Sequence, residues 1–364
     1  MQTGLPYAII KKKRSPVGIR TFGGKDMKTY VAIGDTAARA TYMTEENVRL
    51  LESLGEVKWA SGDRVTPEQA AAEIGDADIY VTLWGSPRLD EQVLKNAPNV
   101  KLLVHLAGTV VPFVSDAMFD RGIRVICGNE FFAESVAEGC IAYILSALRL
   151  IPDQSSALKN EKRWKGANGA LVEDRGLLNK TVGIISFGSI SKYLVEMLQV
   201  FHCKIKLYSR KPLDEEYRRA KNIEQASIEE IFSTCDVISV QTAYNEHTHH
   251  MINGEHFKLI KPGALFLNTS RGKVIDELAL IEELKTGRFT AFLDVYEQEP
   301  PAEDNELYNL PNVYMMPHRG GPTIDRRPVI AENLFKEAYA YVNDPTSPLK
   351  DEVTREKAAT MTNR

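Results

Sequence analysis

The stretch VGIISFGSIS, residues 182–191, joins a short apolar run to the start of a helical pattern. A strand, a glycine-containing turn and a helix in this order form the βαβ unit that binds dinucleotides, whose fingerprint is G-x-G-x-x-G. The three fingerprint positions here are Ser186, Gly188 and Ser191. The stretch therefore predicts a Rossmann unit, and it leaves open whether that unit still binds a cofactor.

The fingerprint glycine that is kept is the one that matters most for a phosphate. The middle glycine lets the pyrophosphate approach the backbone, so a side chain at Gly188 would collide with it. Serine is small enough to fit near a helix and can offer a hydroxyl to a phosphate. The N-terminus of the following helix presents unpaired N–H groups to an anion. We therefore predict cofactor contacts at Ser186, Gly188, Ser189 and Ile190, although a βαβ unit without a cofactor would give a similar pattern.

The end of the next strand bears on the choice of cofactor. About 20 residues after the turn, an NAD site places an acidic residue against the ribose, whereas an NADP site places an arginine near the 2′-phosphate. Ser209, Arg210 and Lys211 stand at this point, and no carboxylate follows until Asp214. We expect NADP to be favoured over NAD, the alternative being a solvated strand end with two surface cations.

Outward from this unit, short β-rich runs alternate with helical patterns, which indicates an α/β fold with parallel sheets. The first set of strands is expected at 29–34, 78–85, 101–108 and 123–128, with helices around 45–54, 67–75, 88–97 and 113–121. The second set is expected at 181–186, 204–209, 236–242, 264–270, 289–295 and 313–317. Most of these runs are apolar without alternation, as strands buried on both faces are. The pattern predicts two doubly wound parallel-sheet domains.

The last helical pattern, residues 330–342, lies beyond the last strand of the second unit and is expected to pack back on the first. This predicts a Rossmann domain at 130–318, inserted in a discontinuous flavodoxin-like substrate domain. That substrate domain comprises 1–129 and 319–364, with 1–26 as an N-terminal extension.

The composition is that of an ordinary soluble protein: 364 residues, 43% apolar, 26% charged, with a formal net charge of −4. It gives no reason to expect nucleic acid or an anionic membrane as a partner. The four cysteines are far apart, which fits a reducing cytoplasm, and no metal is expected at EHTHH, residues 246–250. The apolar segment after Glu134 is taken as too short and too polar to span a bilayer, and is interpreted as a buried helix.

Ionisable side chains follow three strands of the second unit. Arg271, Asp294 and His318 stand at or just after strand ends, and Glu299 follows Asp294. In parallel sheets such ends converge on one crevice, where ligands bind. The set suits reduction of a 2-oxo acid: Arg271 would hold the carboxylate and polarise the carbonyl, His318 would donate a proton, and Glu299 would orient the imidazole.

On these residues the sequence resembles the D-isomer-specific 2-hydroxyacid dehydrogenase family, over about residues 78–350. The motifs that carry the resemblance are TVGIISFGSI, LNTSRGKVIDELALIEELKTGRF, LDVYEQEP and LPNVYMMPHRGGPT. It implies that Arg271, Glu299 and His318 are catalytic and that Asp294 faces the nicotinamide. The cofactor site it implies also includes Thr242, Thr269, Ser270 and Gly320.

The resemblance further implies a substrate site in the first domain. The loop of Ala107, Gly108 and Thr109 would bind the substrate carboxylate through backbone amides, and Trp84 and Gly85 would face the substrate from a second loop. The helix after Glu134 resembles one used for dimerisation, and a homodimer is expected.

Three departures from the family pattern bear on specificity. Ser186 replaces a glycine, Ser209-Arg210 replaces an acidic residue, and Arg319 follows the histidine where an apolar residue is common. Arg319 would favour an anionic or phosphorylated acid, unless it forms a surface or interdomain salt bridge. The acid itself, of the glyoxylate, hydroxypyruvate or 3-phosphoglycerate type, is left open. An NAD(P)-sensing corepressor-like binding protein on the same scaffold is the alternative to an enzyme.

Overall fold

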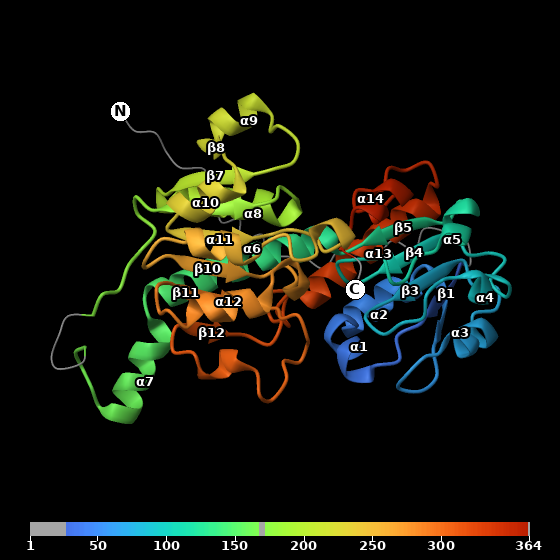
Figure 1. Ribbon diagram of the computed structural model, residues 1–364. Coiled ribbons are helices and arrows are strands. Elements are labelled where there is room, and N and C mark those ends of the chain that lie inside the picture. Colours follow the sequence, from blue (N-terminus) through green and yellow to red (C-terminus); the bar gives the residue numbers. More distant parts are fainter. Residues whose placement is uncertain (1–26, 167–171, 363–364) are drawn as a thin grey trace, which may run out of the picture.

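In the computed structural model, which describes residues 27–166 and 172–362, two parallel sheets lie side by side in separate lobes (Figure 1). The first sheet has the order β2-β1-β3-β4-β5, which is that of flavodoxin-like folds. Its strands are β1 (Met27–Val31), β2 (Gly55–Trp59), β3 (Ile79–Thr82), β4 (Leu102–His105) and β5 (Arg124–Cys127).

The second sheet has the order β12-β11-β10-β9-β6-β7-β8. The chain runs outward from β6 in one direction and then returns to continue on its other side from β9, so the β6–β9 boundary is a switch point where ligands bind. Its strands are β6 (Thr181–Ile185), β7 (Lys204–Tyr208), β8 (Ile223–Gln225), β9 (Val237–Val240), β10 (Leu265–Asn268), β11 (Thr290–Leu293) and β12 (Val313–Met315).

Helices cover both faces of the five-stranded sheet because each face carries its own buried apolar cluster. One cluster takes side chains from α1 (Thr36–Tyr42), α2 (Glu45–Glu52) and α13 (Arg327–Asn343), and the other from α3 (Pro67–Glu73), α4 (Glu91–Leu94), α5 (Asp116–Asp120) and α14 (Arg355–Ala359). The chain thus returns at α13 to complete the first lobe. The predicted α/β fold class is confirmed, and the predicted domain boundaries stay a prediction.

The seven-stranded sheet is covered in the same way. One cluster takes side chains from α6 (Asn129–Leu148) and α8 (Ser189–Leu198), and the other from α10 (Ile228–Thr234), α11 (Gly254–Leu259) and α12 (Glu277–Leu284). Two further helices, α7 (Ile151–Glu161) and α9 (Glu215–Ala220), lie at the edges of this lobe (Figure 1). Short 3₁₀ turns occur at Gln199–Phe201, Glu246–Thr248, Gly272–Val274 and Glu306–Asn309.

The helix α6 corrects one expectation. With 20 residues it is long and apolar enough to cross a membrane by length and composition, so the judgement that it is too short and too polar was wrong. In the structure it packs on the seven-stranded lobe, with Ala137, Cys140 and Ile144 fully buried, as expected of a buried helix.

The expected strands and helices are present, most of them with shorter bounds; α13 is longer than the expected 330–342, and β1 begins two residues before its expected start. Two strands were missed. β2 alternates between half-buried and exposed residues, and β8 has only three residues; both lie at sheet edges. The helix expected at 88–97 covers only Glu91–Leu94. The extension at 1–26 lies outside the described residues.

Candidate active site

The fingerprint turn joins β6 to α8 at the switch point. The N–H of Ser186 donates to the carbonyl of Tyr208 at 2.9 Å, which fixes the turn beside the end of β7. Ser186 has φ of 85°, a left-handed conformation that glycine adopts without cost and serine does not. The backbone thus keeps the turn of the glycine fingerprint although the residue has changed.

The other two fingerprint positions differ in what surrounds them. A Cβ added to Gly188 would meet no protein atom within 4 Å, so the space next to its backbone is open. The buried Ser191 donates its hydroxyl to the carbonyl of Ser186 at 2.8 Å. This serine therefore braces the turn, and its hydroxyl is not directed to a phosphate as the sequence suggested.

The residues at this turn fit a dinucleotide. Within the described residues, the N–H groups of Gly188, Ser189 and Ile190 donate to no protein acceptor, and no side chain caps α8. Unpaired amides at a helix N-terminus, next to open space, form an anion site for a pyrophosphate. The hydroxyl of Ser189 is engaged with Glu130 Oε1 at 2.8 Å, so its contact to the cofactor would be through its backbone.

The end of β7 adjoins this turn. Ser209 is half-buried, and Arg210 and Lys211 are exposed. Neither cation forms an ion pair within residues 27–166 and 172–362. Both are free to meet an anion beside the turn.

Asp294, at the end of β11, is almost fully buried and holds the backbone that follows His318. Its carboxylate accepts from the N–H of Arg319 at 2.7 Å and of Gly320 at 2.8 Å, and from the hydroxyl of Tyr143 at 3.3 Å. Burial raises the pKa of Asp294, against the opposing effect of the donated N–H groups. Gly320 is required here because a Cβ would lie 2.8 Å from Asp294 Oδ2.

Glu299 and His318 form a hydrogen-bonded pair. Glu299 Oε2 lies 2.7 Å from His318 Nδ1, which leaves Nε2 for a substrate. The side chain of Glu299 is 37% exposed and that of His318 is 40% exposed. A substrate in solution can therefore reach His318. Burial raises the pKa of Glu299, but the hydrogen bond to His318 and the nearby charge of Arg271 outweigh it, and the net pKa lies below the usual value.

Arg271 follows β10 and is half-buried, with Nη1 donating to the carbonyl of Ser270 at 2.7 Å. The next residue, Gly272, packs so closely on the backbone of Tyr296 that a Cβ there would overlap it. This contact ties the arginine to the loop that carries Glu299. The structure thus brings together three of the side chains that the sequence placed in the catalytic set.

Three other expected cofactor residues are buried at the ends of β9 and β10. Thr242 donates to the carbonyl of Ile185 at 3.4 Å, and the Ser270 hydroxyl donates to Asn268 Oδ1 at 2.8 Å. Thr269 Oγ1 lies 3.1 Å from Cys140 Sγ. The polar groups of these three side chains therefore already have partners within the protein.

On the opposite lobe, the loop after β4 presents backbone amides. Within the described residues, the N–H groups of Ala107, Gly108 and Thr109 donate to no protein acceptor. Consecutive unpaired amides suit a carboxylate. Trp84, from the loop after β3, packs edge-on against His105 at 5.5 Å, and the adjacent Gly85 is exposed with φ of 81°.

The helix α6 contributes residues that the sequence analysis missed. Phe132 packs against the apolar cluster of the first lobe, 3.4 Å from a Cβ added to Gly108 and 3.9 Å from one added to Gly321. Tyr143 stacks on Phe292 with centroids 4.4 Å apart while it binds Asp294. Phe132 and Tyr143 are spaced so that they lie on the same face of α6. This helical spacing is the only signal in the sequence that could have identified them as site residues.

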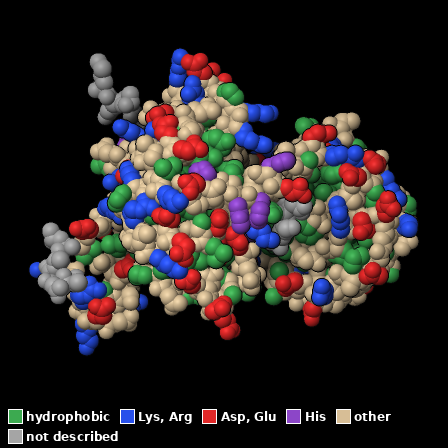
Figure 2. Space-filling view, viewed as in Figure 1, with side chains coloured by type: hydrophobic (Ala, Val, Ile, Leu, Met, Phe, Trp, Pro, Cys, Tyr) green, Lys and Arg blue, Asp and Glu red, His purple; other side chains and the backbone are tan. Residues whose placement is uncertain are grey.

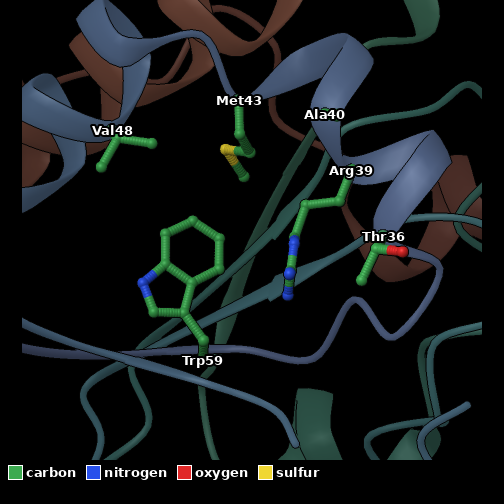
Figure 3. Close-up of a pocket in the computed structure, with 6 residues that line it drawn as sticks. All are labelled: Thr36, Arg39, Ala40, Met43, Val48 and Trp59. Atoms are coloured by element: carbon green, nitrogen blue, oxygen red, sulfur yellow. The ribbon is translucent and has the colours of Figure 1, made fainter. Parts of the chain in front are cut away.

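Two further surface features lie outside this set. Figure 2 shows histidine side chains grouped near the junction of the two lobes. In the second lobe, the rings of His249 and His250 stack with centroids 4.0 Å apart, and His250 Nε2 lies 2.8 Å from Glu297 Oε1. No three metal-ligating side chains are grouped to hold a metal in the part of the chain that the structure describes. Figure 3 shows a hollow between α1, α2 and β2, lined by Thr36, Arg39, Ala40, Met43, Val48 and Trp59.

The two parallel-sheet lobes and the set of Arg271, Glu299 and His318 are those of a class of nicotinamide-dependent oxidoreductases, as comparison with known proteins shows. Residues 141–320 match the model of the NAD binding domain of D-isomer specific 2-hydroxyacid dehydrogenases. A glyoxylate reductase of Thermococcus litoralis is 31% identical over 312 residues, which cover 84% of this chain and 92% of that protein. A D-3-phosphoglycerate dehydrogenase of Methanocaldococcus jannaschii is 32% identical over 319 residues, covering 84% of this chain and 58% of that protein.

A solved structure agrees at the level of the fold. The crystal structure of a glyoxylate reductase from Paecilomyes thermophila has a TM-score of 0.74 at 23% identity, and covers 91% of this chain and 99% of that one. The chain belongs to the D-isomer specific 2-hydroxyacid dehydrogenase family. It is an NAD(P)-dependent dehydrogenase of 2-hydroxy acids, as the sequence predicted, and nothing in these relatives favours the corepressor alternative.

Proposed function

We propose that this protein is an NADPH-preferring reductase of a small 2-oxo acid of the glyoxylate or hydroxypyruvate type. Several relatives of comparable length are named glyoxylate reductase, which supports the substrate class. The observation that carries the cofactor preference is the exposed pair Arg210 and Lys211 at the end of β7, with no carboxylate before Asp214.

The proposed roles follow from where each group lies. A bound nicotinamide cofactor supplies the hydride. The unpaired amides of Ala107, Gly108 and Thr109 bind the substrate carboxylate together with Arg271, whose charge also polarises the carbonyl. His318 donates a proton from Nε2 to the carbonyl oxygen as the hydride arrives, and Glu299 holds Nδ1 and balances the imidazolium charge.

The cofactor site is proposed to use the open space at Gly188 for the pyrophosphate, and Asp294 for the carboxamide end of the nicotinamide. Ser209 and Arg210 would then lie at the ribose, because Ser186 and Tyr208 join the two strand ends. A charge-assisted contact to a 2′-phosphate contributes about 1.5–3 kcal/mol. This corresponds to a preference for NADPH over NADH of roughly ten- to a hundredfold in kcat/KM.

The experiment compares NADPH and NADH oxidation with glyoxylate in the wild type and in Arg210→Ala. We expect the preference to shrink in Arg210→Ala. Lys204→Ala is the matched control, since Lys204 is an exposed cation at the opposite end of the same strand. Equal or better kcat/KM with NADH in the wild type would refute the preference.

The acid is identified with a panel of glyoxylate, hydroxypyruvate and phosphohydroxypyruvate. Arg319 is exposed and forms no ion pair within residues 27–166 and 172–362, so the salt-bridge alternative finds no support there. A phosphorylated acid is the second candidate substrate, on the strength of this cation beside His318. A lower KM for phosphohydroxypyruvate that is lost in Arg319→Ala would favour it.

A further inference from the structure

The loop proposed to bind the substrate carboxylate is held from two directions. On one side, β5 supports it: the N–H of Gly128 donates to the carbonyl of Ala107 at 3.0 Å, and Cys127 Sγ lies 3.3 Å from the carbonyl of Gly108. On the other side, the hydroxyl of Thr109 donates to the carbonyl of Thr362 at 2.9 Å. The loop is thus bonded to a residue that lies 253 positions later in the sequence.

The C-terminal segment that supplies this carbonyl is firmly attached. Residues 351–353 run along the edge of β5, with the N–H of Cys127 donating to Asp351 at 3.1 Å and the N–H of Val353 donating to Val125 at 2.9 Å. Arg124 holds both carboxylate oxygens of Glu352, at 2.7 and 2.8 Å.

Beyond this pairing, α14 continues the attachment up to the loop. Ala358 is buried, Met361 packs against the same apolar cluster, and the N–H of Met361 donates to Ala358 at 3.0 Å. The position of Thr362 is therefore set by the packing of the whole segment and is not that of a loose end.

These contacts hold the loop through two carbonyls and one hydroxyl and do not use its amides. The carbonyls of Ala107 and Gly108 face β5, the nearly buried Thr109 side chain (7% exposed) faces the C-terminal segment, and the three N–H groups have no acceptor within the described residues. A backbone rotation at Thr109 would turn its N–H away from the N–H groups of Ala107 and Gly108.

We propose that the Thr109 hydroxyl and the C-terminal segment 360–362 position the carboxylate-binding loop, and so set the affinity for the 2-oxo acid. The proposal rests on the proposed function. The Thr109 side chain acts here in positioning, because its hydroxyl donates to the carbonyl of Thr362 while the backbone N–H is left for the substrate. The segment therefore belongs to the substrate site although it follows the last helix of the fold.

The first test uses an isosteric pair. Thr109→Val keeps the shape and removes the donor, and should raise KM for the 2-oxo acid about two- to tenfold, the range of one neutral hydrogen bond. The kcat and the dissociation constant of NADPH should change less than KM. Thr109→Ser keeps the donor and should restore KM toward the wild-type value. An unchanged KM in Thr109→Val, or equal losses in the Val and Ser variants, would overturn the proposal.

A second test asks whether hydroxyl and segment act together. A chain ending at Ala359 should show the same rise in KM as Thr109→Val, and the two changes combined should add nothing further. Additive effects would show that Thr362 is not the partner through which Thr109 acts, and would contradict the proposal.

A third measurement needs no substrate. Amide hydrogen exchange in a peptide covering residues 105–112 should be faster in Thr109→Val than in the wild type or Thr109→Ser. If the wild type reduces no 2-oxo acid, the proposed function has failed, and the exchange rates still decide the structural claim. Unchanged exchange in Thr109→Val would refute the positioning role by itself.

Discussion

Replacing Gly188 by alanine should separate cofactor binding from folding. A Cβ at this position meets no protein atom within 4 Å, and its backbone φ of −106° suits any residue. Alanine lowers the conformational entropy of the unfolded chain, which stabilises the folded protein by about 0.4–1 kcal/mol. Alanine is also a poorer N-cap than glycine, which destabilises it by a similar amount. The free energy of unfolding should therefore change by less than about 1 kcal/mol.

The cofactor should be affected far more. The Cβ would stand beside the unpaired amides of Ser189 and Ile190, where a pyrophosphate must approach. Loss of one charge-assisted hydrogen bond costs about 1.5–3 kcal/mol, so the dissociation constant of NADPH should rise roughly ten- to a hundredfold.

Gly183→Ala is the matched control in the preceding strand. Its Cβ would overlap the side chain of Ile231 and lie 2.9 Å from Cys235 Sγ, away from the cofactor. Overpacking costs about 1–3 kcal/mol, so this variant should unfold several degrees earlier while the folded protein binds NADPH normally.

The assays are thermal unfolding without cofactor, followed by circular dichroism, and titration with NADPH, followed by fluorescence. The reasoning fails if Gly188→Ala binds NADPH like the wild type. It also fails if this variant is destabilised as strongly as Gly183→Ala, because the space at Gly188 would then be needed by the protein itself.

Three other predictions concern catalysis, pH and assembly. His318→Asn should lower kcat about 10²- to 10⁴-fold with unchanged NADPH affinity, and normal turnover would remove His318 from the mechanism. The pKa of Glu299 is lowered, so its stabilising contribution is present above the ordinary carboxyl pKa and lost as pH falls through the folded value. Urea midpoints at pH 7 and pH 3.5 should therefore differ less in Glu299→Gln than in the wild type, and an equal difference would contradict this. The partly exposed apolar side chains of α6 predict a homodimer, which light scattering at micromolar concentration checks; a monomer would count against it.

The sequence predicted those features that follow from local pattern. Strands buried on both faces are continuous apolar runs, and the ends of parallel strands converge, so Arg271, Glu299 and His318 could be grouped without a structure. β2 was not predicted, because it lies at an exposed edge of the sheet and its glutamate and lysine are not typical of a buried strand.

Contacts between distant parts of the chain could not be predicted in the same way. Tyr143 reaches Asp294 across 151 residues, and no local pattern marks that pair. Ser191 stands at a fingerprint position, but its hydroxyl donates to the carbonyl of Ser186, whose left-handed backbone only the structure shows.

The return of the chain to its first lobe has a consequence for synthesis. Ile330, Leu334 and Phe335 of α13 are fully buried against strands made more than 200 residues earlier. While the ribosome produces the second lobe, this face of the first sheet is covered by α1 and α2 alone, and the apolar surface that α13 buries stays exposed. The second lobe contains all of its own strands and can fold during that interval. The first lobe completes its core only when α13 has been made, and until then its exposed apolar residues are a surface that a chaperone can protect from aggregation.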